Sequence, residues 1–235
     1  MLWLNAFALV LVLALTGEAR AQESSETRTE FWPEIQAFIK LKPKWRIFLN
    51  GTVSRSLEDG ELPPGQPYEA LIGAHLDYLP NQHFILRGGY RYITSLNESD
   101  PYKEHRVVVE QHIRTLLRGD ILLSDRNRED FRFINGDFSF RYRNRVTLER
   151  EFQIKNRSLT PYASAEIFYD TRFDTFNRNR FAFGLVYLIK RKYAPLKMLF
   201  PEKDISLDIY YMFQNDSHSS PRHVNGIGIA LAFYY

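Results

Sequence analysis

The stretch N-G-I-G-I-A-L-A-F-Y-Y, residues 225–235, decides the fold of this chain. Every second residue in it is bulky and apolar: Ile227, Ile229, Leu231, Phe233 and Tyr235. Most of the residues between them are glycine or alanine. Because successive side chains of a strand point to opposite faces, we expect a strand with one bulky face and one small face. Soluble edge strands usually carry charge or proline against edge pairing. This stretch has neither, so it predicts a strand that closes a membrane barrel with its bulky face in lipid.

The composition agrees with a barrel and disagrees with a helical membrane protein. The 235 residues suit one domain. A mean hydropathy of −0.36 is too polar for a helix bundle in lipid. Beyond the N-terminus no apolar run reaches the roughly 18 residues that a membrane helix needs. The strands of a membrane barrel contain no long apolar run, because lipid-facing and lumen-facing residues alternate along them. The aromatic content of 15% is enough for interfacial girdles.

Charge and cysteine usage exclude several other classes. The chain has no cysteine, which excludes disulfides, thiolate metal sites and cysteine nucleophiles. The 31 basic and 28 acidic residues nearly balance, and the basic ones alternate along strands instead of clustering. We therefore expect no nucleic-acid partner. The expected partners are membrane lipid, the outer-membrane assembly machinery during insertion and, if the lumen is open, a small anionic solute. The sequence predicts no oligomeric state.

The chain divides into three segments by composition. Residues 1–21 have an apolar core and end in Ala19-Arg20-Ala21, which predicts a cleaved secretory signal peptide. Residues 22–30 are polar and predict a short periplasmic lead-in. Residues 31–235 alternate with a period of two almost throughout and predict the barrel. This organisation places the protein in the outer membrane of a Gram-negative cell envelope.

The alternation predicts about eleven strands of roughly ten residues each, long enough to cross a bilayer when tilted. An odd count conflicts with both ends lying in the periplasm, so we expect an even number within ten to twelve, with twelve preferred. The uncertain part is residues 119–132, where Asp125, Asn127 and Glu129 share a row with apolar residues. Either a bulge shifts the register there or the strand projects beyond the bilayer. Asn135-Gly136 predicts a tight hairpin.

With these strands laid out, the chain resembles an uncharacterised barrel family, domain of unknown function 2490. The resemblance lies in E-H-R-V-V-V-E-Q-H-I-R (104–114), F-R-Y-R-N-R-V-T-L-E-R-E-F (140–152), N-R-N-R-F-A-F-G-L-V-Y (177–187) and the C-terminal strand. Each piece alone is an alternating basic and aromatic strand, so the order of the pieces makes the resemblance specific. It implies an outer-membrane barrel and transfers no activity and no catalytic or binding residue.

The predicted inward rows are rich in arginine and carboxylate. The arginines are Arg87, Arg91, Arg106, Arg114, Arg141, Arg143, Arg145, Arg178 and Arg180. The carboxylates that face them are Asp77, Glu110, Glu149, Glu166, Asp170 and Asp208. The rows have two interpretations: a basic track that guides an anionic solute, or a network of paired side chains that fills a narrow lumen. We favour the filled lumen, because side chains this long occupy much of a small barrel.

Motifs of enzymes and cofactor sites are absent from the sequence. It contains no G-x-S-x-G and no H-E-x-x-H, and we expect no metal and no cofactor. A loop dyad of Ser219 or Ser220 with His218 or His223 lacks an identifiable orienting group. The leading expectation is a non-enzymatic barrel that serves envelope integrity or assembles with a partner. The first alternative is a narrow anion-preferring, porin-like channel, and the second is a lipid-modifying enzyme.

Overall fold

The computed structural model describes residues 27–57, 65–96, 98–99, 101–155, 157–189, 204–219 and 221–235. The predicted signal peptide, residues 22–26 of the predicted lead-in and residues 190–203 lie outside the described residues. None of the described residues forms a helix long and apolar enough to cross a membrane.

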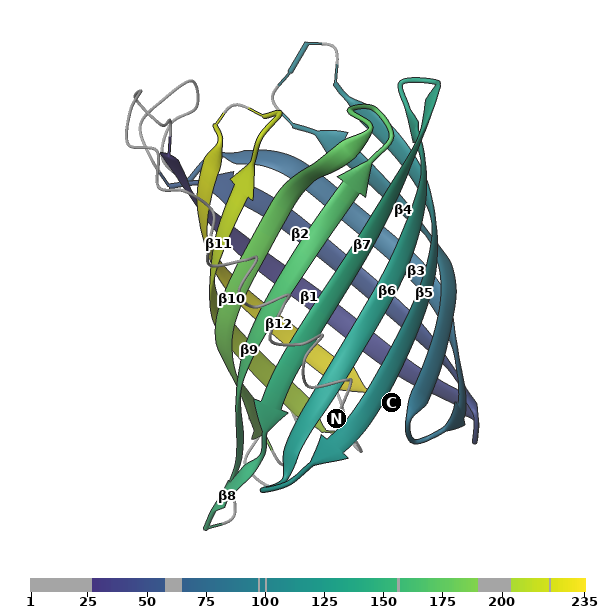
Figure 1. The fold of residues 1–235 in the computed structure, drawn as a ribbon, viewed down its shortest axis with the longest axis vertical. Coiled ribbons are helices and arrows are strands. Elements are labelled where there is room, and N and C mark those ends of the chain that lie inside the picture. The colour runs from purple at the N-terminus through teal and green to yellow at the C-terminus, as the bar shows by residue number, and fades with distance from the viewer. Residues whose placement is uncertain are drawn as a thin grey trace.

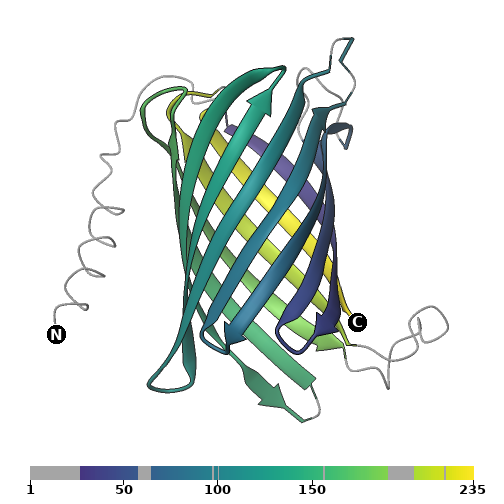
Figure 2. The same ribbon diagram turned by 90° about the vertical axis from the view of Figure 1, so that its right-hand side faces the viewer.

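Eleven strands form a closed barrel, and a twelfth, β8, extends its wall at one end (Figures 1 and 2). β8 has 3 residues and pairs only with β9. The strands are β1 (Thr27–Lys42), β2 (Trp45–Ser56), β3 (Pro67–Asn81), β4 (Phe84–Ser95), β5 (Lys103–Leu117), β6 (Ile121–Ile134), β7 (Asp137–Arg150), β8 (Phe152–Ile154), β9 (Arg157–Asp170), β10 (Thr175–Ile189), β11 (Ile205–Asp216) and β12 (His223–Tyr234). The all-β barrel fold is confirmed.

The barrel closes by a parallel pairing of its first and last strands. Thr27 of β1 lies beside His223 of β12, and Phe38 lies beside Tyr234. All the other neighbouring strands are antiparallel. The predicted range of ten to twelve strands is confirmed, but the even number within it is wrong for the closed barrel, because a parallel closing pair permits an odd number. The lead-in predicted over residues 22–30 is also too long, because Thr27–Glu30 already belong to β1.

Parallel closure puts Thr27 and Tyr235 at opposite ends of the barrel. We call the end that carries the β2–β3, β4–β5, β6–β7, β9–β10 and β11–β12 connections the loop end. The opposite end, which carries the β1–β2, β3–β4 and β5–β6 connections and Tyr235, is the turn end. In Figure 1 the strands β1 and β12 descend together from the loop end at the top toward the turn end.

Burial in this barrel is the reverse of that in a soluble protein. On the outward rows, the exposed fractions of Ile35, Ile72 and Phe183 are 63%, 65% and 64%. On the inward rows, Asp130 and Asp170 are 0% exposed. A water-soluble protein does not expose apolar side chains all round and bury charges, whereas a barrel surrounded by lipid does. The protein is a transmembrane barrel.

The uncertain region of the sequence folds without a bulge. β6 pairs with β5 and with β7 in unbroken register along its whole length. Asn135 and Gly136, which join β6 to β7, have φ of 50° and 100°, the left-handed conformation that a tight hairpin turn requires. Asp125, Asn127 and Glu129 consequently point outward, in the same row as the apolar residues beside them.

The small face of β12 turns into the lumen. Gly228 faces the ring of Tyr210 and Gly226 faces the side chain of Met212, both on β11. A Cβ atom at either glycine would overlap the side chain that lies across it. Glycine at these two places lets large residues of β11 lean over β12, while Ile227 and Ile229 face outward at 40% and 36% exposure.

Candidate functional site

The inward rows carry the predicted charged residues into one lumen. Arg87 and Arg91 lie on β4; Arg106, Glu110 and Arg114 lie on β5; Arg141, Arg143, Arg145 and Glu149 lie on β7; Glu166 and Asp170 lie on β9; Arg178 and Arg180 lie on β10; Asp208 lies on β11. Two of them lie away from the central cavity, toward the turn end. Arg114 donates to the backbone carbonyl of Gln82 in the β3–β4 turn, and Glu149 is the second-last residue of β7.

One group of ion pairs centres on Glu166. This carboxylate is 2% exposed. Arg143, Arg145 and Arg126 approach its oxygens at 2.8, 2.9 and 3.0 Å, and Arg180 lies 3.7 Å away. Four guanidinium groups from three strands thus share a single carboxylate, which leaves this part of the wall with an excess of positive charge.

A second group lies nearer the loop end, around Asp170 and Glu104. Arg132, Arg141 and Arg172 lie 3.0, 2.8 and 2.9 Å from one oxygen of Asp170. Glu104 accepts hydrogen bonds from Arg132 and from Tyr102, which precedes β5. Burial, with the Glu104 carboxylate beside it, raises the pKa of Tyr102 to about 12, so its hydroxyl stays protonated and donates.

A third group occupies the wall formed by β2 to β6. Arg46 and Arg87 each bind Asp77 at 2.6 Å. Arg128 binds Asp130 at 2.6 Å and lies 3.5 Å from Glu110. These three carboxylates are 0% exposed, because the arginines lie over them. Acidic groups therefore form the outer layer of the charged lining, and guanidinium groups form the inner layer.

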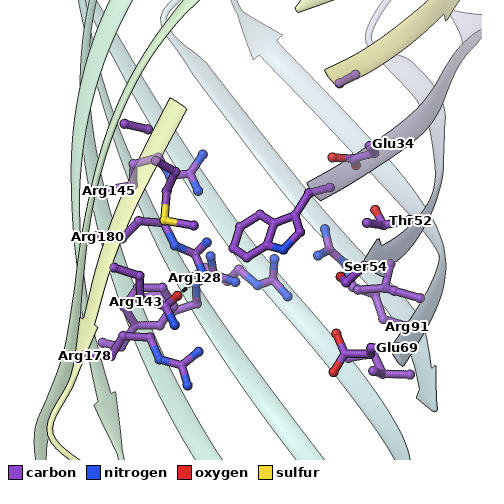
Figure 3. Close-up of a pocket in the computed structure, with 18 of the residues that line it drawn as sticks. Glu34, Thr52, Ser54, Glu69, Arg91, Arg128, Arg143, Arg145, Arg178 and Arg180 are labelled. Atoms are coloured by element: carbon purple, nitrogen blue, oxygen red, sulfur yellow. Dashed lines mark hydrogen bonds between the residues drawn. The ribbon is translucent and has the colours of Figure 1, made fainter. Parts of the chain in front are cut away.

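This layering gives the central cavity a cationic surface. The cavity has a volume of about 750 Å³. Fourteen arginines line it: Arg28, Arg46, Arg87, Arg91, Arg106, Arg126, Arg128, Arg132, Arg141, Arg143, Arg145, Arg172, Arg178 and Arg180. Of the carboxylates that the structure describes, only five do so: Glu30, Glu34, Glu69, Glu104 and Asp208. In Figure 3, Arg143, Arg145, Arg178 and Arg180 gather on one side of the cavity, and Glu34 and Glu69 lie on the other.

Two of the lining arginines are weakly paired. Among the described residues, the nearest carboxylate to Arg91 is that of Glu110, 4.0 Å away, and the only side-chain hydrogen bond of Arg91 runs to His75. Arg180 donates to the amide oxygen of Gln214, and its Nε has no partner among the described atoms. Buried guanidinium donors that lack acceptors favour the entry of an anion.

The sequence analysis missed the arginines of β6. Arg126, Arg128 and Arg132 all point inward and take part in the groups above. The alternation of residues 121–134 contained this information, but the polar residues in the opposite row obscured it. Trp32 was also missed: its indole reaches from β1 to within 5.0 Å of the Arg180 guanidinium on β10, three strands along the wall. No sequence signal marks a side chain that crosses a lumen.

The candidate dyad of the β11–β12 loop does not assemble in the described residues. The hydroxyl of Ser219 donates to the backbone carbonyl of Pro221, and the ring of His218 stacks on Phe173. His223 stacks on Phe213 at the start of β12. Ser220 lies outside the described residues. No group of three His, Asp or Glu side chains in the described part of the chain is arranged to hold a metal ion.

Comparison with known proteins identifies the family of this chain and one similar barrel structure. The model of the family described as "Protein of unknown function (DUF2490)" matches residues 29–225. The chain belongs to this family. No curated protein matches it. Among solved structures, the β domain of the Bordetella autotransporter BrkA is similar, with 13% identity, 83% of each chain covered and a TM-score of 0.42. The predicted family is thus confirmed, and with it an outer-membrane-type barrel fold.

Proposed function

We propose that this protein is an outer-membrane barrel that admits small anionic solutes to an arginine-lined lumen. The observation that carries the proposal is the lining of the 750 Å³ cavity, where fourteen arginines face five carboxylates. Rings of arginine select anions because they replace part of the water shell of the anion with fixed positive charge. The outward apolar rows and the alternation of the strands support a bacterial outer membrane as its location.

The cavity favours this function over the filled lumen expected from side-chain length. In a filled lumen each guanidinium would meet a carboxylate of its own, and little volume would remain. Here four guanidinium groups surround Glu166, and Arg91 and Arg180 extend toward the cavity with weak pairing. The competing function is a sealed barrel whose rigid charged core serves the integrity of the envelope or assembly with a partner.

Conductance across planar bilayers separates the two functions. We expect steady steps whose reversal potential, under a tenfold KCl gradient, shows preference for chloride over potassium. Replacing both Arg91 and Arg180 by glutamine removes two weakly neutralised charges from the lining. The double variant should lower the chloride-to-potassium permeability ratio by about twofold or more, because these charges act directly on ions in the lumen.

The matched control removes the same charge outside the lumen. Arg55 and Arg150 are exposed at strand ends, so their double replacement by glutamine should leave the selectivity unchanged. Absence of conducting steps from correctly folded protein would refute the channel and favour the sealed barrel. Equal effects of the two double variants would show that the arginines of the lumen do not select the ion.

A further inference from the structure

The outward face of the barrel carries one polar area that a lipid-facing wall does not need. It consists of six residues on three adjacent strands, which we call the wall patch: Gln111 on β5; Asp125, Asn127 and Glu129 on β6; Tyr142 and Asn144 on β7. Asn127 pairs in register with Gln111 on one side and with Asn144 on the other. The patch is therefore continuous across the three strands.

The wall patch lies at the depth of the apolar wall and does not project beyond it. Asn127 is in the middle of the 14-residue strand β6. Toward the turn end, the outward row continues with Leu123 beside Leu148. Toward the loop end, it continues with Phe133 beside Phe138, which are 43% and 61% exposed. Apolar residues resume on both sides, so the patch faces the hydrocarbon region of the bilayer.

The polar side chains of the wall patch form hydrogen bonds with one another, but two of the six side chains take no part in them. Asn144 donates to Asp125 at 2.6 Å and to the amide oxygen of Asn127 at 3.1 Å, and Tyr142 donates to the same oxygen at 2.5 Å. No hydrogen bond or ion pair joins the side chain of Glu129 or Gln111 to any described residue. Ionisable groups that face hydrocarbon are costly and usually have a partner.

This chain does not supply that partner from its own outer wall. On the outward rows of the described strands, lysine and arginine occur only at or next to strand ends: Lys42, Arg55, Lys103, Arg150 and Arg157. A second copy that docked through the same patch would bring four carboxylates together without any cation. The charge of the patch therefore calls for a different molecule, one that carries positive charge at mid-membrane depth.

We propose that the wall patch docks a membrane-embedded protein segment that presents a lysine or arginine within an apolar surface. The cation binds Asp125 and Glu129, the amides of Gln111, Asn127 and Asn144 accept its remaining donors, and Phe133 and Leu123 contact its apolar flanks. The contact is lateral, from the lipid side, and is independent of whatever passes through the lumen.

The chemistry of the partner can be tested with a defined probe. The chain has no cysteine, so a single cysteine at Ile113, in the outward row beside the patch, accepts a fluorescent donor. The full chain is reconstituted in phosphatidylethanolamine and phosphatidylglycerol vesicles with an acceptor-labelled leucine-alanine transmembrane peptide that carries one central lysine. The comparison peptide has leucine at that position. We expect half-maximal energy transfer at an about tenfold lower peptide-to-lipid ratio for the lysine peptide.

Two controls distinguish binding at the patch from general attraction. The D125N/E129Q variant should abolish the preference for the lysine peptide. The D137N/E98Q variant, which removes two charges at the loop end of the barrel, should keep it. The proposal is overturned if both peptides associate equally, if D125N/E129Q keeps the preference, or if labelled copies transfer energy to one another instead. Circular dichroism of each variant confirms that the barrel has formed.

Discussion

At the scale of single residues, the lining of this barrel depends on a few carboxylates that each hold several arginines. Glu166 is the clearest case, with four guanidinium groups within 3.7 Å of its oxygens. Removing such a carboxylate is worse than losing one ion pair, because the remaining cations stay buried together without a counter-charge. Because several guanidinium groups share each of these carboxylates, the lining carries more positive than negative charge. The surface of the cavity is therefore cationic.

Replacement of Glu166 by glutamine should therefore destabilise the barrel by about 3–5 kcal/mol, the range for an uncompensated buried charge. The measurement is urea unfolding of the protein refolded in lipid vesicles, followed by tryptophan fluorescence. Asp137→Asn is the matched control: it removes the same charge from an exposed position at the start of β7 and should change the free energy of unfolding by less than about 0.5 kcal/mol. Equal effects of the two changes would contradict the role of Glu166.

At the scale of the strands, the parallel pairing of β1 with β12 determines how the sheet closes. Eleven strands in an up-and-down order leave the first and last strands pointing the same way. Bulky residues of both strands face outward and the small face of β12 faces the lumen, so side chains of β11 and β1 can extend over it. The small face of β12 thus provides the space that Tyr210 and Met212 occupy.

Spin labels can measure the direction of this pairing. Phe31 lies beside Ile227 in the parallel register, and Phe233 lies 6 residues farther along β12. With labels on cysteines at Phe31 and Ile227, electron–electron double resonance should give a distance shorter by roughly 15 Å than with labels at Phe31 and Phe233, since strands rise about 3.3 Å per residue and neighbouring strands lie about 4.8 Å apart. The reverse order of the two distances would mean antiparallel closure and an even number of strands.

At the scale of the whole molecule, Trp32 places a large aromatic side chain inside the arginine-lined lumen. Trp32 donates its indole N–H to Glu30 at 2.7 Å and extends across the cavity toward Arg180. It therefore holds a bulky group in the path that the arginines line. In the proposed channel this residue sets the width available to a solute, whereas the charged groups set its sign.

Trp32→Ala should widen this path and raise single-channel conductance roughly twofold while leaving the anion preference in place. The control is Trp45→Ala, because Trp45 lies on the outer face at the turn end, where it packs against Tyr78 with tilted rings whose centroids are 4.7 Å apart. It should leave conductance unchanged. If both variants conduct like the original protein, Trp32 does not form the constriction.

The sequence alone determined the class of fold, because a period of two with bulky residues on one row is a local property of each strand. It also placed Arg87, Arg141, Glu166 and their neighbours on inward rows, since alternation assigns every residue to one face. The tight turn at Asn135-Gly136 was equally local. The alternation was ambiguous over Asp125 to Glu129, where the outward row itself contains polar residues.

Tertiary structure decided the rest, because it depends on which strands meet. The direction of the closing pair fixed the strand count at eleven, against an expectation derived from where the two chain ends should lie. The arrangement of side chains in the lumen likewise could not be predicted from single strands. Carboxylates such as Asp77 and Asp170 lie behind guanidinium groups from other strands, and Trp32 crosses to a strand that it does not pair with. The sequence determines which charged residues lie on the inward rows. The cationic surface of the cavity forms only when eleven strands enclose the lumen.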